Sequence, residues 1–305
     1  MASVRAGDSP HRPIMVEEVL RCLRPIAGQV AIDCTLGGGG HAQAILEHLQ
    51  PGGRLIGFDS DPLELPRTEA RLRAAGFGAD VFVTRHGNFA RLPELLAAEG
   101  LAAADVIVAD LGVSSMQVDD PARGFSYLPG PLDMRMNPSE GEPAWQLLDR
   151  LDEEALAALL TENADEPHAG LIAGLLKQKP IKTTHALERF VRLGLNKALP
   201  NLEKAEVKMS VRRTFQAIRI TVNNEFSALD ALLRSLPQCL APGGRAAILT
   251  FHSGEDRRVK KAFQAGARAG VYADVASAVI RSTKEETFSN RRAAAAKLRW
   301  AVRAI

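Results

Sequence analysis

Short apolar runs alternate with amphipathic segments along the first third of the chain. The apolar runs are bounded by glycine, proline or polar residues, as buried strands are, whereas the amphipathic segments repeat apolar residues at helical spacing. The pattern predicts strands at residues 30–33, 54–59, 81–84 and 105–110, and helices at residues 15–23, 42–49, 63–75 and 92–98. Such alternation favours an α/β fold with a doubly wound sheet.

The pattern changes after residue 116. Residues 117–138 are rich in Pro, Gly and Asp and predict a long loop, and only helical patterns follow until about residue 202. The α/β pattern then resumes, with predicted helices at 215–220, 226–236 and 255–265 and strands at 245–251 and 297–303. We therefore expect an inserted helical domain at residues 117–212 within an α/β domain formed by residues 1–116 and 213–305.

Composition excludes several classes of protein. With 305 residues, 46% hydrophobic and 24% charged, the chain is too apolar for wholesale disorder, and no apolar stretch is long enough to span a membrane. The first ten residues carry an acid and no apolar core, so we expect neither a secretory signal nor a transit peptide. Cys22, Cys34 and Cys239 are far apart, which predicts no disulfide framework, no metal site and a cytoplasmic location.

Charge is informative only in its distribution. The net charge of +2 is too balanced to indicate a nucleic-acid partner, but basic residues cluster between positions 177 and 219 and again at the end of the chain. Either these clusters are solvated helix faces or they bind phosphates. The members are Lys177, Lys179, Lys182, Arg189, Arg192, Lys197, Lys204, Lys208, Arg212, Arg213 and Arg219, and then Arg291, Arg292, Lys297, Arg299 and Arg303.

Four glycines join the first predicted strand to the following helix, at residues 37–40. Such a loop lets backbone amides approach a ligand at a helix N-terminus, and Asp59 ends the next strand at the spacing of a ribose-binding acid. Both a dinucleotide and S-adenosylmethionine use this arrangement. Asp33 before the loop would repel a pyrophosphate and suits a cationic ligand, which favours the methyl donor. The alternative is a plain tight turn, with Asp59 capping a helix.

Two further residues follow predicted strands. Phe89 can stack on an adenine or belong to the core. Asp110 ends the fourth strand, where ligands of an open parallel sheet bind, or it caps a helix.

Eight segments together resemble one family, the bacterial 16S ribosomal RNA cytosine-N(4) methyltransferases, also called the RsmH or MraW family. The segments run in the family's order at residues 11–15, 33–41, 110–115, 123–126, 130–136, 213–219, 222–225 and 251–256. The resemblance implies a Rossmann-like S-adenosylmethionine-dependent methyltransferase sheet with an inserted all-helical domain, and a cytosine of the decoding centre in the small ribosomal subunit as the substrate. It also implies that the cofactor contacts Gly39, Gly40, His41, Asp59, Phe89, Asp110 and Gln117.

The chain departs from the family's pattern at four places. Residues 208–212 stand where the family has a His-Pro-Ala stretch, Asn137 replaces an Asp, Gly254 replaces a Leu, and residues 290–299 differ from the usual C-terminal motif. The cofactor motifs are intact, so methyl transfer is more strongly indicated than the identity of the base. Three alternatives follow: a diverged methyltransferase acting on another RNA site, a catalytically silent RNA-binding assembly factor, and, less favoured, a nicotinamide-dependent oxidoreductase.

The chemistry of amino-group methylation selects the catalytic candidates. Methyl transfer from a sulfonium needs orientation and a proton acceptor rather than a protein nucleophile. Asp110 is the first candidate acceptor, with Ser114, Ser115 and His252 as orienting groups. Carbon-5 methylation would need a cysteine in the crevice, and none of the three is suitably placed.

The inserted domain holds most of the basic residues and few cofactor candidates. We expect it to bind RNA phosphates, while Phe125 and Tyr127 either hold the flipped base or pack within their loop. The RNA-binding candidates are Arg123, Phe125, Tyr127, Arg135, Lys204, Lys208, Arg212 and Arg213. The expected partner is 16S ribosomal RNA within the small subunit, without a membrane or a metal; the oligomeric state is left open.

Overall fold

A computed structural model describes residues 13–305, so the start of the chain and residues 11 and 12 of the first family segment lie outside the described residues. The described chain divides into two compact units, one formed by residues 13–112 and 228–305 and the other by residues 113–227. These junctions differ from the predicted ones at 117 and 213. The second differs because helix α10 (Lys204–Val222) runs unbroken through residue 213.

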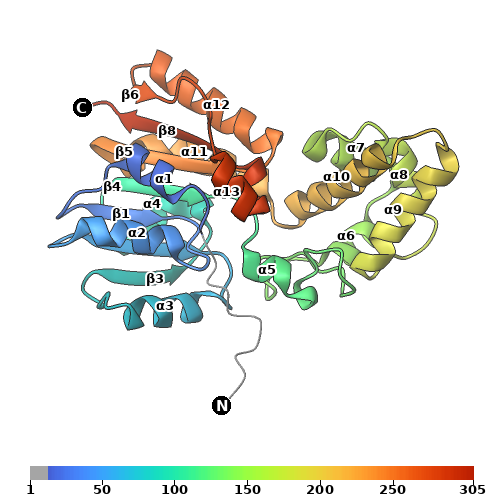
Figure 1. Cartoon of the computed structure of the whole chain (residues 1–305), viewed down its shortest axis with the longest axis horizontal. Coiled ribbons are helices and arrows are strands. Elements are labelled where there is room, and N and C mark those ends of the chain that lie inside the picture. Colours follow the sequence, from blue (N-terminus) through green and yellow to red (C-terminus); the bar gives the residue numbers. More distant parts are fainter. Residues whose placement is uncertain (1–12) are drawn as a thin grey trace. The chain divides into compact units, whose positions relative to one another are not determined.

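The first unit is an α/β sheet domain, as expected. Across residues 13–305, eight strands form one sheet with the order β3-β2-β1-β4-β5-β8-β6, and β7 pairs with β8 (Figure 1). Strands β1 to β5 run parallel to one another, whereas β8 runs antiparallel to β5 and β6. The bounds are β1 Val30–Asp33, β2 Arg54–Asp59, β3 Phe82–His86, β4 Ala104–Asp110, β5 Leu240–Thr250, β6 Tyr272–Val275, β7 Ile280–Arg281 and β8 Lys297–Arg303.

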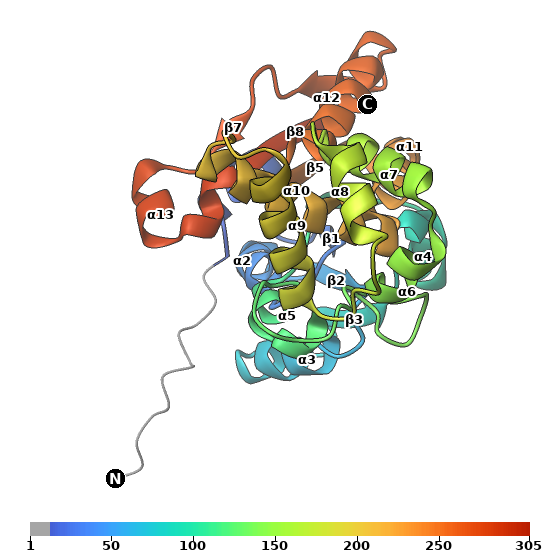
Figure 2. The same cartoon turned by 90° about the vertical axis from the view of Figure 1, so that its right-hand side faces the viewer.

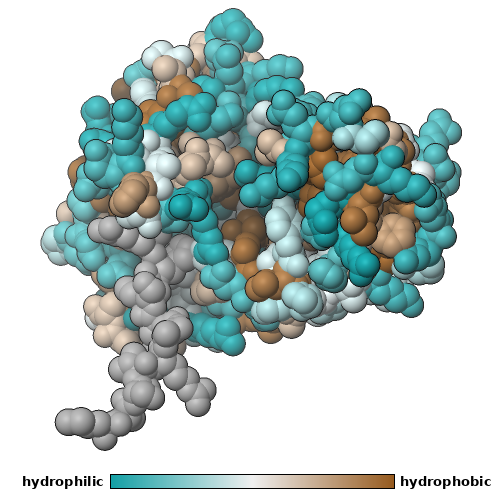
Figure 3. All heavy atoms as spheres, turned by 45° about the vertical axis from the view of Figure 1, so that its right-hand side comes forward, coloured by the Kyte–Doolittle hydropathy of each residue, from teal (hydrophilic) through white to brown (hydrophobic). Residues whose placement is uncertain are grey.

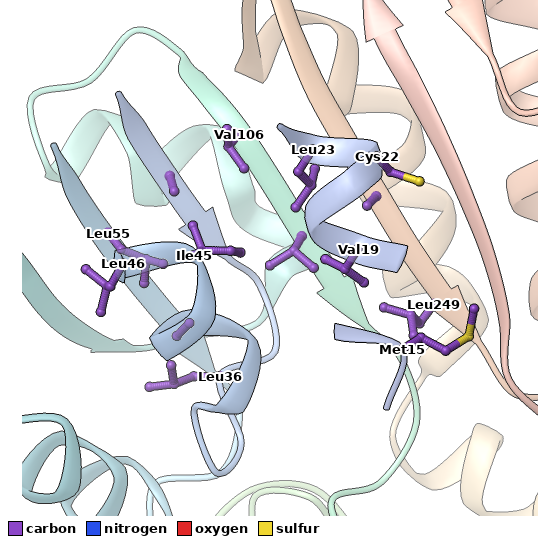
Figure 4. Packing of buried hydrophobic residues seen from close by; sticks show 14 of the residues in the cluster. Met15, Val19, Cys22, Leu23, Leu36, Ile45, Leu46, Leu55, Val106 and Leu249 are labelled. Atoms are coloured by element: carbon purple, nitrogen blue, oxygen red, sulfur yellow. The ribbon is translucent and has the colours of Figure 1, made fainter. Parts of the chain in front are cut away.

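Helices cover both faces of this sheet. Successive residues of a strand point to opposite faces, so Val106 and Val108 of β4 pack in one core and Ile107 and Ala109 in the other. Helices α1 (Val16–Leu23), α2 (Gly40–Leu49) and α3 (Leu65–Ala74) line the first core, part of which is drawn in Figure 4. Helices α4 (Leu92–Ala98), α11 (Glu225–Cys239) and α12 (Ser253–Arg268) line the second. Strands buried on both faces read as continuous apolar runs, which is why the sequence revealed them.

Some elements of this unit escaped prediction. Strands β6 and β7 and helix α13 (Lys284–Ser289) are short and mostly exposed, so they carry little apolar periodicity. The same applies to the 3-10 turns η1 (Phe89–Arg91) and η3 (Arg291–Ala295). Strand β5 begins at Leu240 rather than 245, because a register irregularity opposite β4 accommodates the Pro-Gly-Gly turn.

The second unit is a helical bundle, in agreement with the predicted pattern. Helices α7 (Glu153–Ala164), α8 (Ala169–Leu176), α9 (Thr184–Ala198) and α10 pack on one another, and α6 (Ala144–Arg150) packs on α10 (Figure 2). Their inward residues form one leucine-rich core. Side chains of Asp152 and Thr183 accept backbone N–H groups and begin α7 and α9, as good N-caps do.

The segment predicted as an uninterrupted loop begins with two short helical turns. Helix α5 (Ser115–Asp119) and the 3-10 turn η2 (Pro121–Arg123) precede an irregular stretch. Pro and Asp at η2 gave this region a loop-like composition although they also begin helical turns.

Hydrophilic side chains cover much of the face drawn in Figure 3, with hydrophobic patches between them. Among residues 13–305, no helix is both long and apolar enough to cross a membrane.

Candidate active site at the carboxyl edge of the sheet

Three aspartates end three neighbouring strands of the first unit. Asp33 ends β1, Asp59 ends β2 and Asp110 ends β4, and β1 lies between the other two. Because the chain order of the strands reverses at β1 and β4, this is the point of an open parallel sheet where ligands bind.

The glycine loop after β1 is closely packed. The N–H of Gly37 donates to Oδ2 of Asp59 at 2.7 Å. Gly39 has a φ of +71°, and a Cβ there would lie 2.7 Å from Thr68 Cγ2; a Cβ on Gly40 would lie 2.6 Å from Pro13. Only glycine suits this backbone, which leads directly into the N-terminus of α2 and its partial positive charge.

Asp59 holds the loop with both of its carboxylate oxygens. Oδ1 accepts the N–H of Asp61 at 2.8 Å, while Oδ2 accepts from Gly37. Burial raises the pKa of Asp59 to about 6, and the two backbone N–H groups oppose that rise. Each carboxylate oxygen can accept a second hydrogen bond, so Asp59 can still receive ribose hydroxyls.

Asp33 and His41 are both buried, and the charge of each influences the pKa of the other. Asp33 is 2% exposed and accepts the N–H of Thr35 at 3.0 Å. Burial raises its pKa to about 6, and His41 is the largest opposing influence. Burial lowers the pKa of His41, whose Nε2 lies 2.9 Å from the carbonyl oxygen of Ile14.

Asp110 has the most unusual environment of the three. Its side chain is 29% exposed, yet its Oδ1 is buried and has no hydrogen-bond partner among residues 13–305, and its Oδ2 lies 3.8 Å from Nδ1 of His41. Burial, assisted by the negative charge of Glu255, raises its pKa to about 7. The cap of α5 is Ser114, so Asp110 is not the helix cap of the alternative reading. An unpartnered carboxylate oxygen here calls for a donor from a ligand.

Two more candidates of the first unit have structural partners. His252 is the N-cap of α12, where Nδ1 accepts the N–H of Glu255 and Nε2 lies 3.2 Å from that residue's Oε1. Phe89 begins η1 and is half-buried against the second core, near the end of β3. Both lie after carboxyl ends of parallel strands, on the side that carries Asp110.

Ser114, Ser115 and Gln117 belong to the second unit and begin α5. Ser114 Oγ accepts the N–H of Gln117 at 3.2 Å, and Gln117 Oε1 accepts the N–H of Ser114 at 2.9 Å. This reciprocal capping box starts the helix and buries Gln117. Ser115 is also buried.

The loop candidates for RNA binding hold their own segment together. Arg123 is 8% exposed and donates to the carbonyl oxygens of Arg135 and Met136, with its guanidinium above the Phe125 ring. Arg135 forms a two-pronged ion pair with Asp133 at 2.8–2.9 Å. Phe125 packs on the helical core. These side chains therefore stabilise the loop to which they belong.

Helix α10 carries the exposed cations. Lys204, Lys208 and Arg212 are exposed at four-residue spacing, and therefore lie along one side of the helix. Tyr127 is 45% exposed and packs edge-on against Phe215 of α10 at 4.8 Å. Burial raises the pKa of the Tyr127 hydroxyl, and Arg212 opposes this rise, so the guanidinium lies near that ring.

Arg213 points elsewhere. Its Nη1 lies 3.9 Å from Oε2 of Glu166, a buried carboxylate that also accepts the hydroxyl of Ser210 at 2.8 Å. Successive residues of a helix lie about 100° apart, which explains why Arg212 is exposed while its neighbour turns inward.

Sequence reasoning overlooked three residues that shape the site. Thr35 Oγ1 accepts the N–H of Asp110, and the Thr68 hydroxyl donates to the carbonyl oxygen of Gly37. The negative charge of Glu255 helps to raise the pKa of Asp110. Glu255 could have been found from its position three residues after a helix start, which is typical of a capping box. Thr68 carries no local signal.

The site residues fit a nucleoside ligand that carries a cationic amino group, as S-adenosylmethionine does. Carboxylates at the ends of β1, β2 and β4 offer acceptors, and the glycine loop offers backbone close to the helix N-terminus. Acids at this edge disfavour a pyrophosphate.

Curated relatives match this chain over nearly its full length. The chain is 45% identical to ribosomal RNA small subunit methyltransferase H 1 of Agathobacter rectalis, over 99% of this chain and 88% of the relative. It is 41% identical to ribosomal RNA small subunit methyltransferase H of Sorangium cellulosum, over 98% and 92% of the two chains. Among solved structures, TrmN from Thermus thermophilus aligns over 95% of this chain and 48% of its own, at 13% identity and a TM-score of 0.44.

The family comparison covers nearly the entire chain. The model of the MraW methylase family matches residues 8–304, which cover both described compact units except Ile305 and include all the residues of the acidic edge. The chain belongs to the MraW methylase family.

Proposed function

We propose that this methylase transfers a methyl group from S-adenosylmethionine to the exocyclic N(4) amino group of a cytosine in 16S ribosomal RNA of the small ribosomal subunit, in the cytoplasm. Family membership and the names of the ribosomal RNA methyltransferases at 41–45% identity support the reaction class. The observation that carries the proposal toward an amino group is Oδ1 of Asp110, which is buried and which no described residue hydrogen-bonds.

The first unit binds the methyl donor. Asp59 receives the ribose hydroxyls, Gly39 and Gly40 supply backbone at the start of α2, and Asp33 provides negative charge for the cationic part of the ligand. Phe89 offers a ring for the adenine. When bound, the cofactor supplies an electrophilic methyl group to the acceptor nitrogen.

Asp110 acts on the acceptor amino group. A cytosine amino group is a poor nucleophile because its lone pair is delocalised into the ring, so a hydrogen bond to one N–H helps it to react. Oδ1 of Asp110 is buried and has no hydrogen-bond partner in the described part of the chain, so it can accept that hydrogen bond and then the proton. Its raised pKa of about 7 lies close to neutral pH, where a carboxyl group can both accept and release a proton.

The cysteines argue for nitrogen rather than carbon-5 as the methyl acceptor. Carbon-5 methylation needs a thiolate, which requires a lowered pKa. Burial raises the pKa of Cys22 and Cys239 to about 11 and that of Cys34 well above its ordinary value. Cys34 also packs within the second core.

The helical unit binds the RNA. Lys204, Lys208 and Arg212 form an exposed cationic row on α10, and Tyr127 adds an aromatic surface near Arg212. Cations that pair with phosphates and rings that stack on unpaired bases are the usual components of RNA recognition. Arg123, Phe125, Arg135 and Arg213 support this surface from within.

A deletion strain tests the proposal directly. Mass-spectrometric mapping should show that its 16S ribosomal RNA lacks one N(4) methyl group. The parent gene should restore this methyl group, whereas the Asp110→Asn gene should not. Loss of a methyl group from another RNA would instead identify a diverged methyltransferase. Failure of the purified protein to bind S-adenosylmethionine in equilibrium dialysis would favour a silent assembly factor.

A further inference from the structure

The protonation state of His41 follows from its hydrogen bond. Its Nε2 lies 2.9 Å from the carbonyl oxygen of Ile14, and a carbonyl oxygen only accepts, so Nε2 must carry the hydrogen. In the neutral ring Nδ1 then has a free lone pair. That Nδ1 lies 3.8 Å from Oδ2 of Asp110.

The surroundings of this pair are acidic. His41 is influenced by Asp33 on β1 and Glu286 on α13 and faces Asp110 on β4, while Asp110 is also influenced by Glu255 on α12 and Asp33 by Asp59 on β2. The carboxylates favour a cationic ring, whereas burial opposes it and lowers the pKa of His41. The ring is therefore neutral at rest but surrounded by charges that stabilise it once it is protonated.

We propose that His41 is a positioning residue that exchanges a proton with Asp110 during methyl transfer. This inference rests on the proposed function. As the bond between the amino nitrogen and the methyl carbon forms and the carbon–sulfur bond breaks, the nitrogen loses one proton to Oδ1 of Asp110. Rotation of the carboxyl group then brings this O–H to Nδ1 of His41, and the two groups share the proton until solvent removes it and both return to their resting forms.

The geometry needs only a small adjustment for this exchange. The distance of 3.8 Å exceeds that of a hydrogen bond by about 0.8 Å, and catalytic hydrogen bonds are commonly long before the ligand binds. The bond to Ile14 holds the ring so that Nδ1, rather than Nε2, faces Asp110.

Two substitutions separate this role from simple anchoring of Ile14. In His41→Gln the side-chain amide can replace Nε2 as the donor to Ile14, but no atom replaces Nδ1. In His41→Asn the amide lies nearer the position of Nδ1 and no longer reaches Ile14. We expect His41→Gln to lower the single-turnover rate at saturating S-adenosylmethionine by roughly 10-fold to 100-fold and to change the pH dependence of the rate. A parental rate and pH profile in His41→Gln would overturn the proposal.

A measurement without methyl transfer distinguishes failure of the pair from failure of the proposed function. In cofactor-free protein labelled with ¹⁵N-histidine, the His41 resonance is identified among the seven histidines by its absence from His41→Gln. We expect the Nε2–H tautomer, and a lower titration midpoint in Asp110→Asn because a nearby carboxylate no longer favours the imidazolium. An Nδ1–H tautomer, or identical midpoints in the two proteins, would refute the pair whatever the enzyme methylates.

Discussion

Thr35 binds the backbone of Asp110: its Oγ1 accepts the Asp110 N–H at 2.6 Å. The N–H of Thr35 in turn donates to Oδ1 of Asp33 at 3.0 Å. One residue of the loop after β1 therefore connects the carboxyl ends of β1 and β4, and it fixes the backbone beside two acids of like charge. The site is held ready before any ligand arrives.

The first prediction concerns the chemical step. Asp110→Asn keeps the shape of the side chain but cannot accept a proton, so the single-turnover rate should fall by roughly 100-fold or more. The affinity for S-adenosylmethionine, measured by titration calorimetry, should fall only modestly. A parental single-turnover rate would rule out Asp110 as the acceptor.

The second prediction concerns ribose binding and the loop. Asp59→Ala removes the acceptor of the Gly37 and Asp61 N–H groups as well as the ribose acceptor, and should weaken S-adenosylmethionine binding by about 1–3 kcal/mol. Asp59→Asn, which keeps one acceptor oxygen, is the matched variant and should lose less. Equal calorimetric affinities of all three proteins would exclude Asp59 from the cofactor site.

The third prediction concerns the dependence of stability on pH. The folded-state pKa of Asp110 is about 7, against about 3.9 for an unfolded aspartate, so the folded protein binds the extra proton between these values. The contribution of this group to the free energy of unfolding is therefore fully present below about pH 4, and it is lost as the pH rises through about 7. Asp110→Asn removes that loss, and should gain up to about 4 kcal/mol over the parent at pH 8 and almost none at pH 4.

Urea unfolding of the cofactor-free protein measures this difference. The chain has two tryptophans, Trp145 in the helical unit and Trp300 on β8, so a Trp145→Phe background makes fluorescence specific for the sheet unit. A stability difference that is the same at both pH values would contradict the raised pKa of Asp110.

The fourth prediction concerns the glycine loop. Gly39 and Gly76 both have positive φ values, of +71° and +99°, but a Cβ at Gly76 would meet no atom of residues 13–305 within 4 Å. Substitution of either by Ala should cost about 1 kcal/mol in backbone strain. Gly39→Ala should in addition displace the loop from Thr68 and weaken S-adenosylmethionine binding, whereas Gly76→Ala should bind normally. Comparable affinities would mean that the loop does not need its observed shape.

The fifth prediction concerns RNA binding. Reversal of Lys204, Lys208 and Arg212 to Glu should weaken binding to the small ribosomal subunit and flatten its dependence on salt, by about one unit of logarithmic slope or less for each lost contact. Binding of S-adenosylmethionine should be almost unchanged.

A control reverses the same amount of charge on the other unit. Lys260, Lys261 and Arg268 are exposed on α12, and their replacement by Glu should affect subunit binding less. If both triple variants lose affinity equally, the effect is one of net charge and the row on α10 is an ordinary solvated face.

The sequence by itself determined the α/β fold, the helical insertion and the positions of the acidic residues. Buried parallel strands require continuous apolar runs, and a strand end followed by glycines places Asp33 next to the loop whatever the rest of the chain does. The apolar runs that end at Asp59 and Asp110 likewise place these two residues at the carboxyl edge.

Only the tertiary structure decided which of these polar groups have partners. Arg123 and Arg212 are both arginines in the insertion, yet the first is enclosed by carbonyl groups and the second is exposed. Likewise His41 faces Asp110, a residue far along the chain, while Ile14 sets the tautomer of its ring. Such pairings depend on how distant segments pack, and the pKa of a buried group depends on that packing and on every charge around it, which no local pattern of residues encodes.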